Sequence, residues 1–350
     1  MKVWMAGLLA ASIGLLAGCG AVVQENRDAA AHREEKQAAL YDPSQYPVTI
    51  KTLGSDGEQH EETFSAPPER VVAIWQNSIE TLIALGEGDR IIAAMGLPSG
   101  DYLRPEYRAV YGQIPYTSME NLDVETIAMM DPDFIVGWSS SFDGKTLRGT
   151  DFWGKRGVHT YISPGSSPVV KFHTIDYEYQ DILHMGQIFG KREEAESIVA
   201  AMEQEIRRAE EEAARQARRP RGLIIELQGK NMTVYGKRTL AGDILKRMGG
   251  ELLAEDIQQI SKEQLIEMDP DAVFVVVIES KYGSEQQILD LLYQEKALQD
   301  LRCIKEKKLY ALPLYAVYSA GVRTYDGIRI IGKGLYPDLY QDSPRKESAL

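Results

Sequence analysis

Two glutamates at matching places are the first residues of this sequence whose chemistry can be argued. Glu125 and Glu263 each lie seven residues before the Pro of an identical Met-Asp-Pro-Asp, at 130–133 and 268–271. Paired carboxylates at equivalent points of two similar lobes can form ion pairs with a basic partner of two-fold symmetry. The alternative is two solvated glutamates at helix starts, where the helix dipole favours negative charge.

The strings around these glutamates predict the same local structure twice. Both "VETIAMMDPDFIVG" (124–137) and "KEQLIEMDPDAVFVV" (262–276) read as a helix, a turn and a buried strand, because Pro ends helices and Asp suits turns. The offset of 138 residues (263 − 125) is far longer than a solenoid repeat. Two chance uses of a common unit are the alternative, and the rest of the chain favours two similar lobes.

Length, composition and charge bound the class of protein. The 350 residues suffice for two domains, and 44% hydrophobic with 26% charged residues is an ordinary globular composition. The net charge of −13 argues against nucleic-acid binding, which needs clustered Lys and Arg.

The N-terminus predicts a secreted, lipid-anchored protein. Residues 1–18 have Lys2 followed by an apolar run that is shorter than the roughly 20 residues of a spanning helix, which fits a signal peptide. "LAGC" at 16–19 resembles the lipobox of bacterial lipoproteins, in which the signal is cut before Cys and the thiol takes a diacylglycerol. Cys19 is therefore the expected lipidation site, and a plain signal peptide with an incidental Cys is the alternative. We expect the protein on the extracytoplasmic face of the cell membrane.

Two further segments follow from this assignment. Residues 19–45 are polar and have no regular hydrophobic pattern, as expected of a tether between the membrane and the folded part of the protein. With Cys19 lipidated, Cys303 is the only other thiol, so no internal disulfide can form. Cys303 is predicted to be a small core residue.

The N-terminal lobe is predicted over 46–190. "YPVTIKTL" and "HEETFSA" flank an Asp-Gly turn, which indicates a hairpin. After it, short apolar runs such as "RVVAIW" (70–75) alternate with helical patterns such as "SIETLIALG". Strands that alternate with helices predict an α/β lobe with a parallel sheet.

One long helix is predicted between two lobes. Residues 191–219 contain no Gly or Pro, and their apolar residues recur every three or four positions as one narrow stripe. Such a helix would be about 43 Å long, and Pro220 would stop it. The strand–helix alternation then restarts, which predicts a second Rossmann-like α/β lobe over 220–340 and a tail over 341–350.

These features together resemble one family. The lipobox, "PERVVAIWQNSIETLIALGEGDRIIAAMG", the two Glu-x₆-Pro-Asp units and one long helix between α/β lobes are similar to the substrate-binding lipoproteins of ABC importers for iron–siderophore, haem and cobalamin. The resemblance covers roughly 46–340. In that family one carboxylate on each lobe docks into Arg residues of the permease dimer, which implies that role for Glu125 and Glu263.

The resemblance also implies a ligand in the cleft between the lobes, outside the carboxyl ends of the strands. The loops there mix aromatic rings, hydroxyls and one guanidinium. The candidate ligand residues are Trp75, Gln76, Asn77, Trp138, Ser139, Phe142, Gln228, Tyr282, Tyr315, Tyr318 and Arg323. An anionic ferric chelate can stack on Trp and Tyr and pair its charge with Arg323.

Rival classes have weaker sequence support. A zinc or manganese receptor needs clustered His and carboxylate ligands, and the five His show no ligand spacing. A nitrogenase-like oxidoreductase shares the lobe topology, but the chain has no Gly-x-Ser-x-Gly, His-Glu-x-x-His or Cys pair. "GIRIIGKG" (327–334) imitates a P-loop, yet Gly334 stands where Ser or Thr must bind magnesium, and Ile328 and Ile331 suit a helix stripe. A surface adhesion lipoprotein is a further alternative.

The expected function is capture of a ferric siderophore and its delivery to an ABC permease, without enzymatic activity and without a resident cofactor or metal. Arg323 and the hydroxyl-rich "WSSS" (138–141) favour a siderophore. Haem, which needs an axial Tyr, His or Met, stays open because several Tyr are available. Cobalamin, which would suit an apolar aromatic cleft with fewer charges, is the other alternative.

Overall fold

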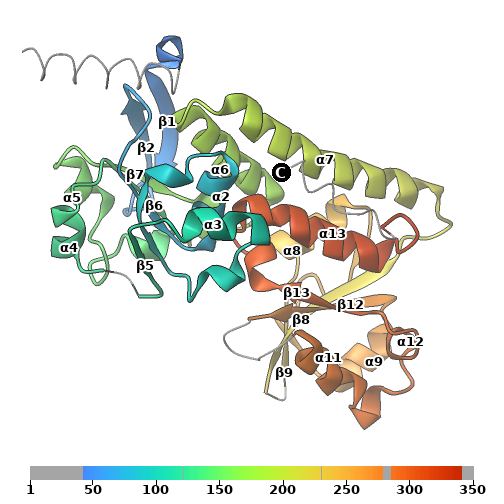
Figure 1. The fold of residues 1–350 in the computed structure, drawn as a ribbon. Helices are drawn as coiled ribbons and strands as arrows, with labels where there is room; N and C mark the ends of the chain where they lie inside the picture. Colours follow the sequence, from blue (N-terminus) through green and yellow to red (C-terminus); the bar gives the residue numbers. More distant parts are fainter. Residues whose placement is uncertain (1–41, 121, 230, 279–284, 341–350) are drawn as a thin grey trace, which may run out of the picture. The chain divides into compact units, whose positions relative to one another are not determined.

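The structure is a computed structural model that describes residues 42–340 except 121, 230 and 279–284 (Figure 1). From Pro47 onward these residues form one compact unit, and Pro43–Gln45 (η1) form a short 3₁₀ helix before it. Cys19 with its lipobox, the signal peptide, the tether up to residue 41, Tyr282 and the tail lie outside the described residues.

The N-terminal lobe is built on a parallel sheet, as predicted. Its strand order is β5-β4-β3-β6-β7, and all neighbours run parallel. The inner strands β3, β4 and β6 are short apolar runs with buried side chains on both faces, because helices cover the sheet. The strand bounds are Val71–Ile74 (β3), Ile91–Met95 (β4), Tyr116–Ser118 (β5), Phe134–Gly137 (β6) and His159–Ile162 (β7).

Helices and a hairpin complete this lobe. The predicted hairpin is confirmed: β1 (Val48–Leu53) pairs antiparallel with β2 (Gln59–Phe64). The core under the sheet includes the fully buried rings of Trp153 and Phe142. The helices are α2 (Gln76–Ala84), α3 (Arg108–Tyr111), α4 (Val124–Met129), α5 (Thr150–Gly154) and α6 (Ile175–Ile188).

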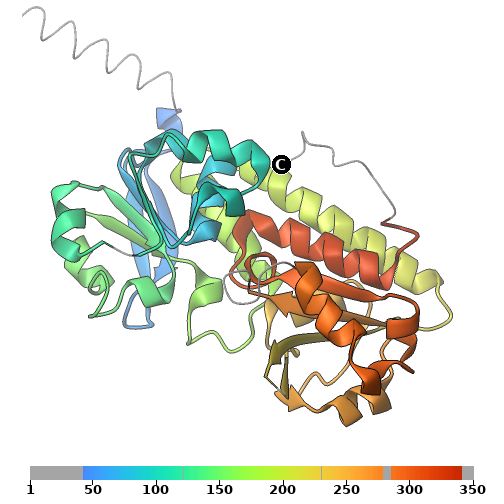
Figure 2. The same ribbon diagram turned by 60° about the horizontal axis from the view of Figure 1, so that its bottom comes forward.

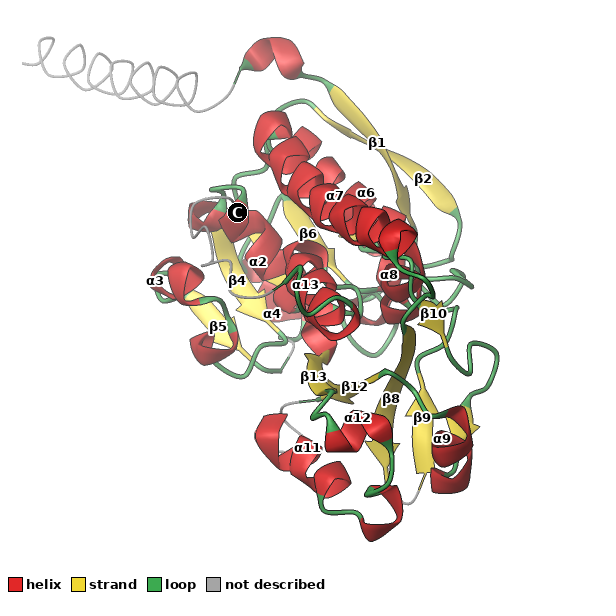
Figure 3. Ribbon diagram, turned by 90° about the vertical axis from the view of Figure 1, so that its right-hand side faces the viewer, coloured by secondary structure: helices red, strands yellow, loops and turns green. Residues whose placement is uncertain are grey.

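The long connecting helix, α7, spans Arg192–Arg215. At 24 residues it is about 36 Å long, and it buries the predicted stripe, including Ile198, Met202 and Ala209, against α6 and α13 (Figure 3). The prediction that it runs to 219 is wrong. Gln216 is extended, and the Arg218 guanidinium forms a 2.5 Å ion pair with Asp271, which draws the chain toward the next strand.

The C-terminal lobe has a mixed sheet. In the order β11-β9-β8-β12-β13, strands β8, β12 and β13 run parallel, as does β10 beside β8, but β9 runs antiparallel to both of its neighbours, β8 and β11. A very short connection joins β8 to β9, and only antiparallel strands can be joined that way. The bounds are Arg221–Gln228 (β8), Asn231–Val234 (β9), Glu251–Leu252 (β10), Gln259–Ile260 (β11), Ala272–Val277 (β12) and Leu309–Pro313 (β13).

Helices cover both faces of this sheet. They are α8 (Leu240–Arg247), α9 (Lys262–Met268), α11 (Glu285–Tyr293), α12 (Arg302–Lys305) and α13 (Thr324–Leu335). Helix α13 lies between the sheet and α7 (Figure 2). A Cβ on Gly334 would lie 2.5 Å from the Phe274 ring, so this glycine serves close packing of α13. Cys303 is fully buried, which confirms its predicted place in the core.

No helix in the described part of the chain is both long enough and apolar enough to cross a bilayer.

Candidate functional site: the cleft between the lobes

The carboxyl ends of the strands of both lobes meet at one cavity of about 190 Å³. Residues that directly follow a strand line it: Trp75 after β3, Gly96 after β4, Met119 after β5, Trp138 after β6, Ile278 after β12 and Leu314 after β13. In open α/β sheets this is the edge where ligands bind. The cavity therefore lies where the sequence placed the ligand cleft.

Two stacked indole rings form the N-lobe wall of this cavity. Trp75 and Trp138 follow the neighbouring strands β3 and β6, at which the strand order reverses direction. Their ring centroids are 4.7 Å apart, and Tyr318 of the C-terminal lobe meets Trp138 edge-on at 5.3 Å. Both indoles are half-buried, so the wall is an aromatic surface suited to stacking.

The backbone holds Trp75 in an unusual conformation. Its φ of 72° is in a region that non-glycine residues rarely adopt, and its N–H donates to the carbonyl of Met95 at 2.8 Å. Gly96 allows the close approach of the ring, since a Cβ there would lie 2.7 Å from it. Nε1 of Trp75 donates to Oγ of Ser141 at 3.2 Å, which fixes the ring orientation.

Asn77 fixes the second indole. Nε1 of Trp138 donates to Oδ1 of Asn77 at 2.8 Å, and Nδ2 of Asn77 donates to Oγ of Ser163 at 3.1 Å. The Asn77 side chain is buried and borders the cavity. It was predicted as a ligand contact, and the structure gives it the further task of orienting Trp138.

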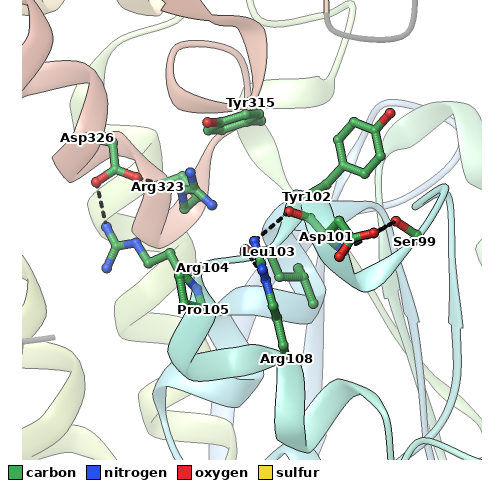
Figure 4. Close-up of a pocket in the computed structure, with 10 residues that line it drawn as sticks. All are labelled: Ser99, Asp101, Tyr102, Leu103, Arg104, Pro105, Arg108, Tyr315, Arg323 and Asp326. Atoms are coloured by element: carbon green, nitrogen blue, oxygen red, sulfur yellow. Dashed lines mark hydrogen bonds and ion pairs between the residues drawn. The ribbon is translucent and has the colours of Figure 1, made fainter. Parts of the chain in front are cut away.

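Arg323 lies in an ion-pair network that joins the lobes. Its Nη1 donates to Glu80 at 2.9 Å, and its Nε donates to Asp326 at 2.6 Å. Arg104 of the N-terminal lobe donates to the same Asp326 at 2.9 Å (Figure 4). The Glu80 carboxyl is completely buried; burial raises its pKa, and Arg323 opposes that shift.

The predicted role of Arg323 as the counter-charge of a ligand needs correction. Two carboxylates of the protein already pair with its Nη1 and Nε: the packing of the lobes brings Glu80 against it, and Asp326 lies three residues further along its own lobe. Its guanidinium carbon also lies 4.2 Å from the centroid of the Tyr315 ring, so it supports a residue that lines the cavity.

The cavity gathers six of the predicted ligand residues and leaves out others. It is lined by Trp75, Gln76, Asn77, Trp138, Tyr315 and Tyr318. Phe142 was predicted to contact ligand, but its ring is 1% exposed in the hydrophobic core, so this prediction is wrong. Ser139 and Gln228 do not line the cavity; Gln228 bonds Glu226 beside it on β8. Tyr282 lies outside the described residues.

Sequence reasoning missed the loops that follow β4 and β5. Leu97, Pro98 and Tyr102 line the cavity from the first loop, and Met119 lines it from the second. The signal was available, since the strand-end rule applies equally to "AAMGLPSG" and "YTSM".

The repeated Met-Asp-Pro-Asp has the same structural role in both lobes. Its first Asp is left-handed in each, with φ 51° at Asp131 and 38° at Asp269. Its second Asp binds the start of the neighbouring strand: Asp133 accepts from the N–H of Arg70 at 2.9 Å, and Asp271 accepts from the N–H of Arg221 at 2.8 Å. This motif therefore ends a helix, and it anchors the start of a neighbouring strand: β3 beside β6 in the N-terminal lobe, and β8 beside β12 in the C-terminal lobe.

The paired glutamates are free of this structural role. Glu125 and Glu263 each occupy the second helical position, of α4 and α9, after the N-caps Asp123 and Ser261. Both side chains are exposed. A hydrogen bond from Ser261 lowers the pKa of Glu263. The repeat thus holds two carboxylates at equivalent surface positions of the two lobes.

No group of three or more His, Cys, Asp or Glu side chains that could hold a metal ion occurs among the residues that the structure describes.

The fold and the cleft define a two-lobed binding protein, and comparison with known proteins identifies the family. The sequence profile of the periplasmic binding protein family matches residues 71–316, which is more than half of the chain. The chain belongs to this family, and it is a substrate-binding protein of an ABC transporter.

Individual relatives are similar to this chain over different shares of their length. A periplasmic binding protein from Veillonella parvula DSM 2008 is 41% identical, with a TM-score of 0.81 over 85% of this chain and 93% of the other. The uncharacterized ABC transporter substrate-binding lipoprotein YvrC of Bacillus subtilis is 21% identical over 97% of this chain and 98% of its own. The iron-uptake system-binding protein of Bacillus subtilis is 25% identical over 54% of this chain and 57% of its own.

Proposed function

We propose that this protein captures a ferric siderophore in the cleft between its lobes and delivers it to the permease dimer of an ABC importer. The observation that carries the proposal is the paired indole wall of Trp75 and Trp138, which lines the cavity together with Tyr315 and Tyr318. Such a wall suits a ligand with flat, polarisable surfaces. The adjoining part of the cleft is lined by arginines and suits a ligand that is also rich in oxygen atoms. The relative named for iron uptake supports the same choice.

Delivery requires docking to the permease and a place at the membrane. We assign docking to Glu125 and Glu263, whose exposed carboxylates occupy equivalent positions on α4 and α9. Attachment is assigned to a diacylglycerol on Cys19, and the relative named as a lipoprotein supports it. Changing Cys19→Ala should release the protein from the membrane fraction; continued membrane association would contradict the assignment.

Tryptophan fluorescence tests the ligand. A ferric siderophore should quench the intrinsic emission at concentrations below about 1 μM. Trp75→Phe and Trp138→Phe should each remove a large share of the quenching. Trp153→Phe is the matched control, because that indole is fully buried in the N-lobe core and donates to the carbonyl of Leu147.

The same titration distinguishes the alternatives. If hydroxamate, catecholate and carboxylate ferric chelates leave the emission unchanged while haem or cobalamin quenches it, the siderophore proposal is wrong and the alternative ligand is identified. Quenching that persists in both cleft variants and disappears in Trp153→Phe would place the ligand elsewhere.

A further inference from the structure

A second and larger cavity adjoins the aromatic one. It has a volume of about 520 Å³, and it shares Tyr102 and Tyr315 with the aromatic cavity (Figure 4). The two cavities are therefore compartments of one cleft that meet at these two tyrosines. The second, here called the polar compartment, is lined mainly by charged and polar residues, including Arg104, Arg108 and Arg323.

The three arginines of the polar compartment differ in how their charges are balanced. Arg104 and Arg323 share Asp326, and Arg323 also pairs with the buried Glu80. Arg108 donates instead to two backbone carbonyls, from Nε to Leu103 at 3.3 Å and from Nη2 to Asp101 at 2.9 Å. Among the described residues it has no carboxylate partner. Arg108 is exposed, and these two carbonyls orient its guanidinium without neutralising its charge.

The remaining donors converge on the same space. Figure 4 shows the guanidinium groups of Arg108 and Arg323 on two sides of the space below Tyr315. Within the described part of the chain, no hydrogen bond or ion pair involves Nη2 of Arg323. The carboxylate of Asp101 faces Ser99, whose hydroxyl lies 3.2 Å from it. Unused N–H donors of two guanidinium groups therefore line this compartment.

We propose that the polar compartment binds a free carboxylate arm of the ligand, with Arg108 as its principal partner and Nη2 of Arg323 as a second donor. A planar guanidinium binds a carboxylate through two parallel hydrogen bonds, which a neutral arm cannot accept with the same strength. This inference rests on the proposed function and narrows it to chelates with two unlike parts. One part stacks on the indole wall, and an anionic arm reaches past Tyr102 and Tyr315.

The test compares a ferric siderophore that carries a free carboxylate arm with its methyl ester. Wild-type protein should bind the acid about tenfold more tightly, which corresponds to about 1.4 kcal/mol. In Arg108→Gln the acid-to-ester ratio should fall close to one, and in Arg108→Lys it should be intermediate, because an ammonium keeps the charge but loses the planar fork. Equal affinity of wild-type protein for acid and ester overturns the inference without any variant.

A matched control is available in the turn after α5. Arg156 is also exposed, donates to a backbone carbonyl (Phe152, 2.9 Å) and lies outside both cavities. Arg156→Gln should keep the wild-type ratio. If the acid-to-ester affinity ratio falls equally in Arg108→Gln and Arg156→Gln, the preference for the acid depends only on the net charge of the protein. That result would overturn a specific role for Arg108.

Metal-free citrate separates this inference from the proposed function. Citrate should bind wild-type protein weakly, and Arg108→Gln should weaken that binding several-fold. Citrate binding that depends on Arg108, without binding of either ferric complex, supports the carboxylate site and contradicts the siderophore proposal. Binding of both ferric complexes at equal affinity supports the siderophore proposal and overturns the carboxylate site. Binding of none of the three probes overturns both.

Discussion

Single residues of the cleft are held by the protein before any ligand arrives. Trp75 has a strained backbone and a hydrogen-bonded indole, and Trp138 is oriented by Asn77. A side chain that is already fixed loses little conformational entropy when a ligand stacks on it. At this scale the cleft is a pre-organised aromatic surface, and its charged neighbours have mainly structural partners.

The Arg323–Glu80 pair should be essential for stability. Arg323→Met would leave the Glu80 carboxylate buried without its cation, which typically costs about 3–5 kcal/mol. Urea unfolding measures this loss, and adding Glu80→Gln should recover part of it. The control is Arg207→Met, which breaks an exposed pair with Glu203 on α7 and should cost less than about 1 kcal/mol. An equal loss in the two single variants would contradict the assigned importance of the buried pair.

Glu178 should make the protein less stable as the pH rises. Burial, and then the nearby Asp181, raise the pKa of Glu178 to about 8, while the N–H of Gly321 donates to it at 2.7 Å. Because the folded state binds this proton more tightly than the unfolded state, the stabilisation is complete below about pH 4.5 and is lost as the pH rises through 8. Burial also raises the pKa of Asp181, to about 6, so the change in stability above about pH 7 comes mainly from Glu178.

Glu178→Gln tests this sign. The variant keeps an oxygen that can accept from Gly321, and it should flatten the fall in the midpoint of thermal unfolding between pH 6 and 9. The fall corresponds to a few kcal/mol, since one unit of pKa shift is about 1.4 kcal/mol. Glu196→Gln, at an exposed position of α7, should keep the wild-type slope. A midpoint that rises with pH in wild-type protein would be inconsistent with a protonated Glu178.

At the scale of secondary structure, helices α4 and α9 explain why the two lobes repeat the Met-Asp-Pro-Asp motif. Helices α4 and α9 begin with a side-chain cap, carry an exposed Glu at the second position, and are followed by a left-handed Asp before Pro. The contacts of Asp133 and Asp271 with the backbone and the helix ends are structural, whereas the glutamates make no comparable contribution to packing. A surface carboxylate kept at equivalent places is the feature that a two-fold-symmetric permease can use.

Docking through these helices predicts a transport defect without a binding defect. Glu125→Ala combined with Glu263→Ala should abolish uptake and leave ligand affinity unchanged, because both side chains lie on the surface outside the two cavities. Loss of a charge from a partly desolvated pair costs about 2–5 kcal/mol of association. Each single change should be milder, and Arg in place of Glu should be worse than Ala because it opposes like charges.

Uptake in cells and affinity in solution measure the two effects separately. Glu267→Ala, an exposed glutamate one turn further along α9, should transport normally. Normal uptake by the double variant would show that the repeat serves the fold alone, and lost ligand binding would assign both glutamates to the cleft.

At the scale of the whole molecule, the lobes should move little on binding. Helix α7 is continuous over 24 residues, and two ion pairs, Glu80–Arg323 and Arg104–Asp326, join the lobes beside the cleft. A continuous helix resists the large hinge that flexible strands permit. X-ray scattering with and without ligand should therefore show a change in the radius of gyration of less than about 1 Å. A decrease of several ångströms would show that α7 bends or that the ion pairs break.

Local patterns in the sequence were sufficient to predict the parallel N-lobe sheet, the hairpin, the long helix and the repeated helix–turn–strand unit. Each depends on neighbours in the chain: apolar periodicity, Asp-Gly turns, and Pro after helices. The strand-end rule also placed Trp75 and Trp138 at the sheet edge that lines the cavity, because the end of a strand is visible in the sequence.

Tertiary structure decided the roles of individual side chains. Phe142 follows a strand as Trp138 does, but its ring turns into the core, and sequence position alone does not give that direction. Arg323 was expected to be the counter-charge of a ligand, yet its Nη1 pairs with Glu80, which is distant in sequence. The end of α7 at Arg215 is likewise not visible in the local sequence. The same is true of the backbone carbonyls that Arg108 contacts in place of a carboxylate. Both depend on which groups lie close in space, and not on which lie close along the chain.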